Sequence, residues 1–267
     1  MNSQARSFNN DYPILLTPVL NLILNTREVL FIFGKTLITC IKGPYRLREV
    51  LFHMYQIGIG SLPIVVISTA FAGFVVTNEI AREMDLALHT VEMIPGFSGQ
   101  FIFRELGIAI PALLLVAKVG ASTTAEIGSM KVTEQIEALR LLQIDPIEYL
   151  VYPRFLASVI VIMCLTLISI FVTMSCAISV AVLKYNFSLL EYLNTLSKFI
   201  TNTDLICAVV KGMVFGAIIP IISCFYGFNC KGGAQGVGSA TTNSVVTSTI
   251  LVIVSDFILT FAFSLIL

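Results

Sequence analysis

Five ionisable residues stand in or beside apolar stretches long enough to cross a membrane: Arg104, Glu105, Lys118, Lys211 and Asp256. An ionisable side chain in hydrocarbon costs about 2.5 kcal/mol or more on insertion scales, and it usually faces a bundle interior or a water-filled cavity. Three kinds of chemistry suit such positions. They are recognition of a polar headgroup, an ion pair between helices, and proton transfer.

Arg104 and Glu105 stand where the second apolar stretch begins. A guanidinium can bind a phosphate, and Glu105 would then shape a polar entrance to the site. The alternative is an interfacial pair that only marks the end of a helix. Lys118 follows about four helical turns later, so its side chain is expected on a similar side of the same helix. It would either extend a basic track from Arg104 or satisfy carbonyl groups between helices.

Lys211 and Asp256 have opposite charges and lie in the fourth and fifth apolar stretches. We expect them to form a structural ion pair between neighbouring helices. A proton relay is less expected, because a single pair offers no chain of titratable groups. The pair could still influence how the bundle opens.

The composition places the chain in a membrane. Hydrophobic residues make up 57% of it and charged residues 12%, and the formal net charge is zero. A water-exposed surface is excluded by these values, and nothing in the charge balance favours a nucleic-acid partner. The six cysteines include no CxxC pair and have no companion histidine spacing, so we interpret them as small apolar residues and expect no metal site.

A helix needs about 20 apolar residues to span a bilayer. This criterion predicts an all-α integral membrane protein with five spans, an N-terminal interfacial helix over Ile14–Phe33 and a short cytoplasmic helix. The expected domains are a cytoplasmic or interfacial region at 1–49 and one transmembrane domain at 50–267. The predicted spans are Val50–Val76, Leu106–Ala125, Leu150–Leu183, Leu205–Phe228 and Val245–Leu267.

Basic residues gather before the first span, whereas acidic residues predominate after it. The positive-inside rule therefore places the N-terminus in the cytoplasm. With five spans, the connector that holds Lys131, Arg140 and Arg154 and the loop at Lys231 also face the cytoplasm. The loop 184–201 and the C-terminus are expected on the outer side.

The segment Glu126–Gln143 is expected to form a short amphipathic cytoplasmic helix. Its apolar residues recur at helical spacing, and its charged residues lie elsewhere on the helix. Asp145 suits an N-cap and Pro146 a first helical turn, so a new helix should begin there. Such a helix could either receive force from a soluble motor or lie as a connector among lipid headgroups.

No nucleotide site is expected in this chain. The glycine-rich run Gly232–Gly238 lacks a preceding strand and the third glycine of the dinucleotide motif, and Gly34-Lys35-Thr36 lacks the first glycine of a P-loop. We interpret Gly232–Gly238 as a tight cytoplasmic turn. The two histidines have no ligand spacing around them, which argues against an embedded enzyme.

Several runs resemble the MlaE/YrbE family of ABC-transporter permeases, and the resemblance covers about Arg104 to the C-terminus. The most specific block is Glu126–Leu139. Ile108 and Lys118 depart from the proline and arginine that the family commonly has there. The matching runs are Arg104–Gly107, Lys118–Ala121, Ala125–Leu139, Asp145–Arg154, Gly232–Thr242 and Ser255–Phe257.

The resemblance implies a non-catalytic permease that works as a homodimer and moves phospholipid or a related lipid between an inner membrane and an outer membrane or envelope. It implies an ABC ATPase partner (MlaF-like), which would use the ATP, and an outer MCE-domain lipid-binding partner (MlaD-like). The host membrane would be a cell inner membrane or a plastid inner envelope. An ion-coupled secondary transporter of an amphipathic substrate is the alternative.

The resemblance also implies roles for named residues. The lipid pathway would include Arg104, Glu105, Lys118, Lys211 and Asp256. The region 126–142 would be the coupling helix that docks on the ATPase, through Glu126, Met130, Val132, Glu134, Gln135, Ile136 and Leu139.

Overall fold

The computed structural model describes residues 17–43, 46–88 and 93–265, and within these ranges every regular element is a helix. The expected all-α architecture is therefore confirmed. In chain order, the elements are α2 (Thr17–Lys42), α3 (Leu47–Leu88), α4 (Ile94–Phe101), the π-helical turn η2 (Ile102–Leu106), α5 (Gly107–Leu115), η3 (Val116–Gly120), α6 (Ala121–Val132), α7 (Gln135–Leu141), η4 (Ile147–Val151), α8 (Tyr152–Tyr185), α9 (Leu189–Phe199), α10 (Asn202–Phe228) and α11 (Gly233–Ser264).

Five helical stretches of the described chain are long and apolar enough to cross a membrane, as predicted. Their bounds are wider than the predicted ones, because helices continue past the hydrocarbon core into the interfaces while an apolar-length criterion measures only the core. Residues 78–88, which lie beyond the predicted first span, extend α3. Residues 233–244 likewise begin α11. The stretches are Leu47–Leu86, Ile94–Val132, Ile147–Tyr185, Asn202–Phe228 and Gly233–Ser264.

The glycine-rich run is a tight turn only at its start. Gly232 and Gly233 have φ of 92° and 69°, which disfavours a side chain there, and α11 begins at Gly233. The prediction of a turn over all of Gly232–Gly238 is therefore wrong, since small residues after the turn continue as helix.

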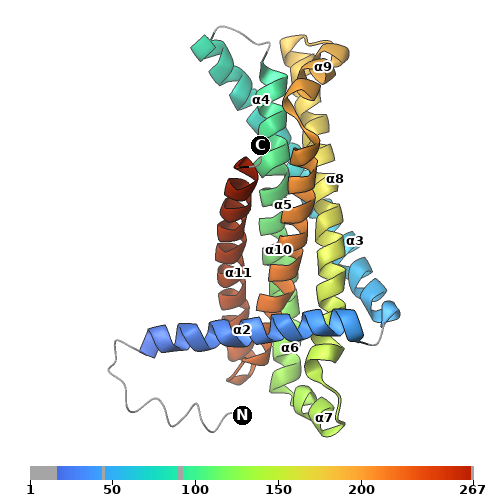
Figure 1. Cartoon of the computed structure of the whole chain (residues 1–267), viewed down its shortest axis with the longest axis vertical. Coiled ribbons are helices and arrows are strands. Elements are labelled where there is room, and N and C mark those ends of the chain that lie inside the picture. Colours follow the sequence, from blue (N-terminus) through green and yellow to red (C-terminus); the bar gives the residue numbers. More distant parts are fainter. Residues whose placement is uncertain (1–16, 44–45, 89–92, 266–267) are drawn as a thin grey trace.

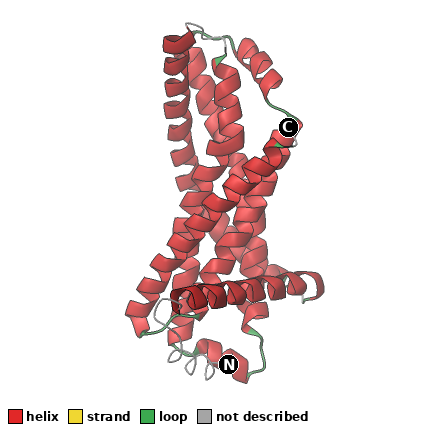
Figure 2. Cartoon of the chain, turned by 60° about the vertical axis from the view of Figure 1, so that its left-hand side comes forward, coloured by secondary structure: helices red, strands yellow, loops and turns green. Residues whose placement is uncertain are grey.

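The long helices run side by side, and α2 lies across one end of the bundle (Figures 1 and 2). The same end carries α7 and the start of α11, and we call it the α2 end. The opposite end carries α4 and α9 (Figure 1), and we call it the α9 end. This grouping agrees with the sidedness expected from charge.

The predicted interfacial helix corresponds to α2, although residues 14–16 lie outside the described residues and α2 extends to Lys42. Lys35 of α2 forms an ion pair with Asp145, which precedes η4. The guanidinium of Arg46 lies 4.4 Å from the centre of the Tyr149 ring. These contacts hold α2 and the start of α3 against the beginning of the third span.

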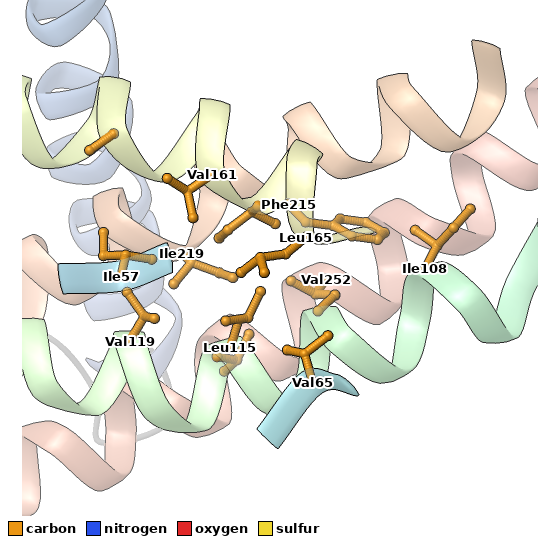
Figure 3. Packing of buried hydrophobic residues seen from close by; sticks show 14 of the residues in the cluster. Ile57, Val65, Ile108, Leu115, Val119, Val161, Leu165, Phe215, Ile219 and Val252 are labelled. Atoms are coloured by element: carbon orange, nitrogen blue, oxygen red, sulfur yellow. The ribbon is translucent and has the colours of Figure 1, made fainter. Parts of the chain in front are cut away.

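The main core lies between α3, α5, α8, α10 and α11, where branched aliphatic side chains interdigitate (Figure 3). Phe215 of α10 is fully buried in this cluster. Its surroundings include Val65, Ile108, Leu165, Ile219 and Val252 (Figure 3).

Two glycines allow α10 to approach α8 closely. A Cβ added to Gly216 would lie 2.7 Å from the Cα of Val159, and one added to Gly212 would lie 3.1 Å from the Cα of Met163. The α8–α10 contact at these two glycines is therefore a backbone-to-backbone approach, which no larger side chain would permit without separating the helices.

Candidate functional site

Two π-helical turns hold three of the five predicted site residues. Arg104 and Glu105 lie in η2, and Lys118 lies in η3. A π turn is wider than an α turn and can leave carbonyl groups available to other partners. The carbonyl oxygen of Arg104 accepts a hydrogen bond of 2.8 Å from Lys211 Nζ. The sequence correctly predicted that Arg104, Glu105 and Lys118 lie in or beside the second span, but no feature of it indicated the two π turns.

Lys211 is fully buried and joins three helical segments. Its Nζ lies 2.8 Å from Asp256 Oδ1 and 3.3 Å from Glu105 Oε1. The hydroxyl of Thr260 donates to Glu105 Oε1 at 2.9 Å. The ion pair predicted between Lys211 and Asp256 is confirmed, and Glu105 adds a second carboxylate to the same ammonium group.

Arg104 forms an ion pair that the sequence analysis missed. Its Nε donates to Asp204 Oδ1 at 2.7 Å, and the Asp204 side chain is only 1% exposed. Asp204 Oδ2 also accepts hydrogen bonds from the backbone N–H and hydroxyl of Thr201, completing a capping box at the start of α10. The signal that could have found Asp204 is a threonine three residues before an acidic residue, directly before an apolar run.

A cavity of about 650 Å³ lies beside Arg104 and Glu105 at the α9 end of the bundle. Most of its lining surface is apolar, and four charged side chains and Gln100 complete the lining. It is therefore amphipathic in the same sense as a lipid. The other lining residues come from α3 and α4 and were not predicted: Glu79, Ile80, Glu83, Met84, Phe97, Gln100 and Phe101.

Lys118 is separate from that cavity. Its Nζ donates a hydrogen bond to the carbonyl oxygen of Gly60 in α3, and its side chain lines a second, smaller cavity of about 160 Å³. Of the two alternatives for Lys118, the structure contains the carbonyl contact. The continuous basic track from Arg104 to Lys118 is not present, because helix packing assigns the two residues to different cavities.

The predicted amphipathic helix over 126–143 is two helices in the structure. The first part belongs to α6, which ends at Val132, and Glu134 adopts a left-handed conformation with φ of 60° before α7 begins. Glu126 is therefore not the first turn of a cytoplasmic helix. Its Oε1 instead accepts a hydrogen bond of 2.7 Å from Arg154 Nη2 of α8.

The apolar side of α7 faces this chain rather than a partner. Ile136 is 1% exposed and packs with Ile127 and Leu150, and Leu139 is half-buried against the same cluster. Periodicity finds an apolar face but cannot show what covers it. Among the predicted docking residues, Met130 is half-buried, and the exposed ones are Glu126, Val132, Glu134 and Gln135.

Charge also fixes the ends of α7 and η4. A hydrogen bond from Lys131 holds the pKa of the Glu137 carboxyl below its usual value, although some burial opposes this. For Asp145, burial favours the neutral form, but hydrogen bonds from Lys35 and from the Ile147 N–H outweigh it and lower the pKa. The latter bond is 3.0 Å long and gives Asp145 the capping role expected from the sequence.

The described residues contain no group of three or more histidine, cysteine, aspartate or glutamate side chains placed to hold a metal ion.

At the α9 end, Tyr192 of the amphipathic helix α9 is buried, and its hydroxyl lies 3.3 Å from Ser98 Oγ of α4. Burial raises the pKa of this phenol. The pair fixes α9 against the helix that lines the larger cavity.

Comparison with known proteins identifies relatives over most of the chain. The family described as Permease MlaE matches residues 50–262. A probable ABC transporter permease protein of Rickettsia typhi is 39% identical over 229 residues, which are 82% of this chain and 85% of that protein. A probable ABC transporter permease protein of Synechocystis is 36% identical over 229 residues, covering 86% and 87%.

A plant protein is similar over a comparable length. Protein TRIGALACTOSYLDIACYLGLYCEROL 1, chloroplastic, of Arabidopsis thaliana is 33% identical over 232 residues, which are 87% of this chain and 66% of that protein. These matches reach well upstream of Arg104. The family indicated by the sequence motifs was therefore correct, but the similarity extends further toward the N-terminus than the predicted start near Arg104.

Proposed function

The chain belongs to the MlaE permease family, and we propose that it moves phospholipid or a related lipid as the membrane subunit of an ABC transporter. The observation that carries the proposal is the amphipathic cavity beside Arg104 and Glu105. Its apolar walls suit acyl chains, and Arg104, whose Nε already bonds Asp204, would present its remaining guanidinium donors to a phosphate group. The name of the plant relative contains that of a glycolipid, which is consistent with a lipid substrate.

We infer that a partner ATPase drives this movement, since the chain lacks a P-loop and its relatives include proteins named as ABC transporter permeases. The α2 end would be cytoplasmic and would carry the ATPase contact. Its exposed residues are the basis for this assignment: Glu134 and Gln135 at the α6–α7 junction, and Leu141 and Leu142 after it. ATP would act in the partner, and this chain would not be catalytic.

The remaining parts of the assembly are proposed from the family. Two copies would form the membrane core, and an MCE-domain lipid-binding protein would bind at the α9 end, where the larger cavity lies. The membrane would be a bacterial inner membrane or, as the chloroplastic relative suggests, a plastid inner envelope.

The role of the cavity beside Arg104 in lipid transfer can be tested by filling it with a larger side chain. Ile80 lines the cavity without joining an ion pair, so Ile80→Trp should obstruct lipid and leave the charged contacts intact. Phe71→Trp, at an exposed position of the same helix, is the matched control. In proteoliposomes that contain the ATPase partner, lipid transfer should fall strongly with Ile80→Trp and remain with Phe71→Trp. Equal transfer by the two variants would remove this cavity from the pathway.

The motor contact is tested by charge reversal at the α6–α7 junction. Glu134→Lys should reduce co-purification of the ATPase, whereas Glu148→Lys, at another exposed glutamate of the same end, should not. Lipid transfer that persists without ATP or any ATPase would overturn the ABC mechanism and favour an ion-coupled carrier.

A further inference from the structure

The smaller cavity, which contains Lys118, has the features of a second binding site. It lies between α3, η3, α6 and α8, and its volume of about 160 Å³ would hold about five water molecules at ~30 Å³ each. Ile57 and Val119, which lie near each other at one side of the core cluster in Figure 3, form its apolar floor. The remaining lining residues are polar or charged: His53, Gln56, Ser61, Lys118, Ser122, Thr123, Glu126 and Arg154.

The cavity carries one unbalanced positive charge. Arg154 and Glu126 neutralise each other through a contact of 2.7 Å. Lys118 reaches only the neutral carbonyl of Gly60, and no carboxylate of the described chain lies within ion-pair distance of its ammonium group. A lysine in a membrane span is costly unless an anion or water accompanies it. The site therefore favours a ligand with a single negative charge.

The cavity also presents an unused hydrogen-bond donor. Ser61 is 1% exposed, and its hydroxyl has no hydrogen-bond partner in the structure. Buried polar groups are nearly always hydrogen-bonded, so this unpaired hydroxyl is available to a ligand that enters the cavity. The hydroxyls of Ser122 and Thr123 and the ring of His53 supply further donors around the same space.

The mouth of the cavity lies on the outside of the bundle, within the membrane spans. Gln56, Lys118 and Ser122 are exposed there, and Lys118, Ser122 and Glu126 follow at intervals of four residues along one helix face. Lys118 is about 20 Å along the helix from Arg104 and a similar distance from the α2 end of α6. A ligand can therefore approach from the membrane without passing through the larger cavity.

We propose that this crevice binds the phosphate group of a ligand through Lys118 and Ser61, as a second anion site separate from the cavity at Arg104. A phosphodiester carries one negative charge and only acceptor oxygens, which matches one ammonium without a carboxylate partner in the described chain and several unpaired donors. Lipid headgroups and free inorganic phosphate share this chemistry. The lateral mouth favours the lipid headgroup.

Native mass spectrometry of the full chain in detergent tests the proposal with three probes. Dioleoylphosphatidylglycerol carries the phosphate, dioleoylglycerol has the same acyl chains without it, and inorganic phosphate has no acyl chains. We expect the phosphatidylglycerol adduct to be at least about tenfold weaker with Lys118→Gln, because a charge-assisted hydrogen bond is lost. Ser61→Ala should weaken it about threefold, because one neutral hydrogen bond is lost. Lys198→Gln, an exposed lysine of α9 that lines neither cavity, should change nothing.

The outcomes separate the two sources of phosphate and the two cavities. Loss of the phosphatidylglycerol adduct in the Lys118 and Ser61 variants supports a headgroup site. Saturable binding of inorganic phosphate alone, with the same sensitivity, supports a free-phosphate site. Repeating the series with Ile80→Trp makes the result independent of lipid binding beside Arg104. Equal phosphatidylglycerol binding by wild type and Lys118→Gln, or equal binding of dioleoylglycerol, would overturn the proposal.

Discussion

Replacement of Lys211 by methionine tests whether the buried charge cluster holds the bundle together. Methionine keeps most of the side-chain volume but removes the ammonium group that binds Asp256, Glu105 and the Arg104 carbonyl. Both carboxylates would then be left without their shared cation. Removing one partner of a buried ion pair costs about 3–5 kcal/mol, so the melting temperature should fall by on the order of 10 °C.

The assay uses the cysteines of the chain. All six are free, and Cys207, Cys224 and Cys230 are buried, so a thiol-reactive dye reports unfolding of the detergent-purified protein. Adding Asp256→Asn to Lys211→Met should restore part of the loss, because it removes one of the two uncompensated charges. Lys198→Met serves as an exposed control. The reasoning is refuted if Lys211→Met melts with the control, or if the double variant is less stable than Lys211→Met.

Three further predictions address packing and the α2 end. Ile136→Asp should lower the melting temperature of this chain itself, because Ile136 is buried inside it and does not form a docking surface. A variant with normal stability that has lost ATPase binding would contradict this prediction. Gly216→Val should destabilise the α8–α10 contact by several kcal/mol, since its side chain would meet the backbone at Val159, and a melting curve like that of wild type would show that the helices can separate freely. The Lys35–Asp145 pair stabilises only with Asp145 ionised, and its lowered pKa makes that contribution complete near neutral pH and lost as pH falls through the acidic range. Wild type should therefore melt above Lys35→Met at neutral pH and converge with it in acid, and a difference independent of pH would exclude this linkage.

Local and compositional features were readable from the sequence because they depend on a few neighbouring residues. Apolar length determined the five spans, and Asp145-Pro146 determined a helix start. The opposite charges of Lys211 and Asp256 in adjacent spans were enough to predict their ion pair, since a membrane interior leaves buried charges few alternatives. Motif resemblance indicated the permease family, although it did not reach α3.

What the sequence left undecided depends on contacts between distant segments. Asp204 partners Arg104 across 100 positions, and Glu105 joins Lys211 across 106. Periodicity identified the apolar side of α7, but only the packed structure turns Ile136 inward. The two cavities are formed by the relative placement of several helices, which no local pattern encodes. Hydropathy and spacing thus predict which segments enter the membrane, whereas helix packing decides which charges are neutralised and which, like Lys118, bond only a neutral carbonyl within the described chain.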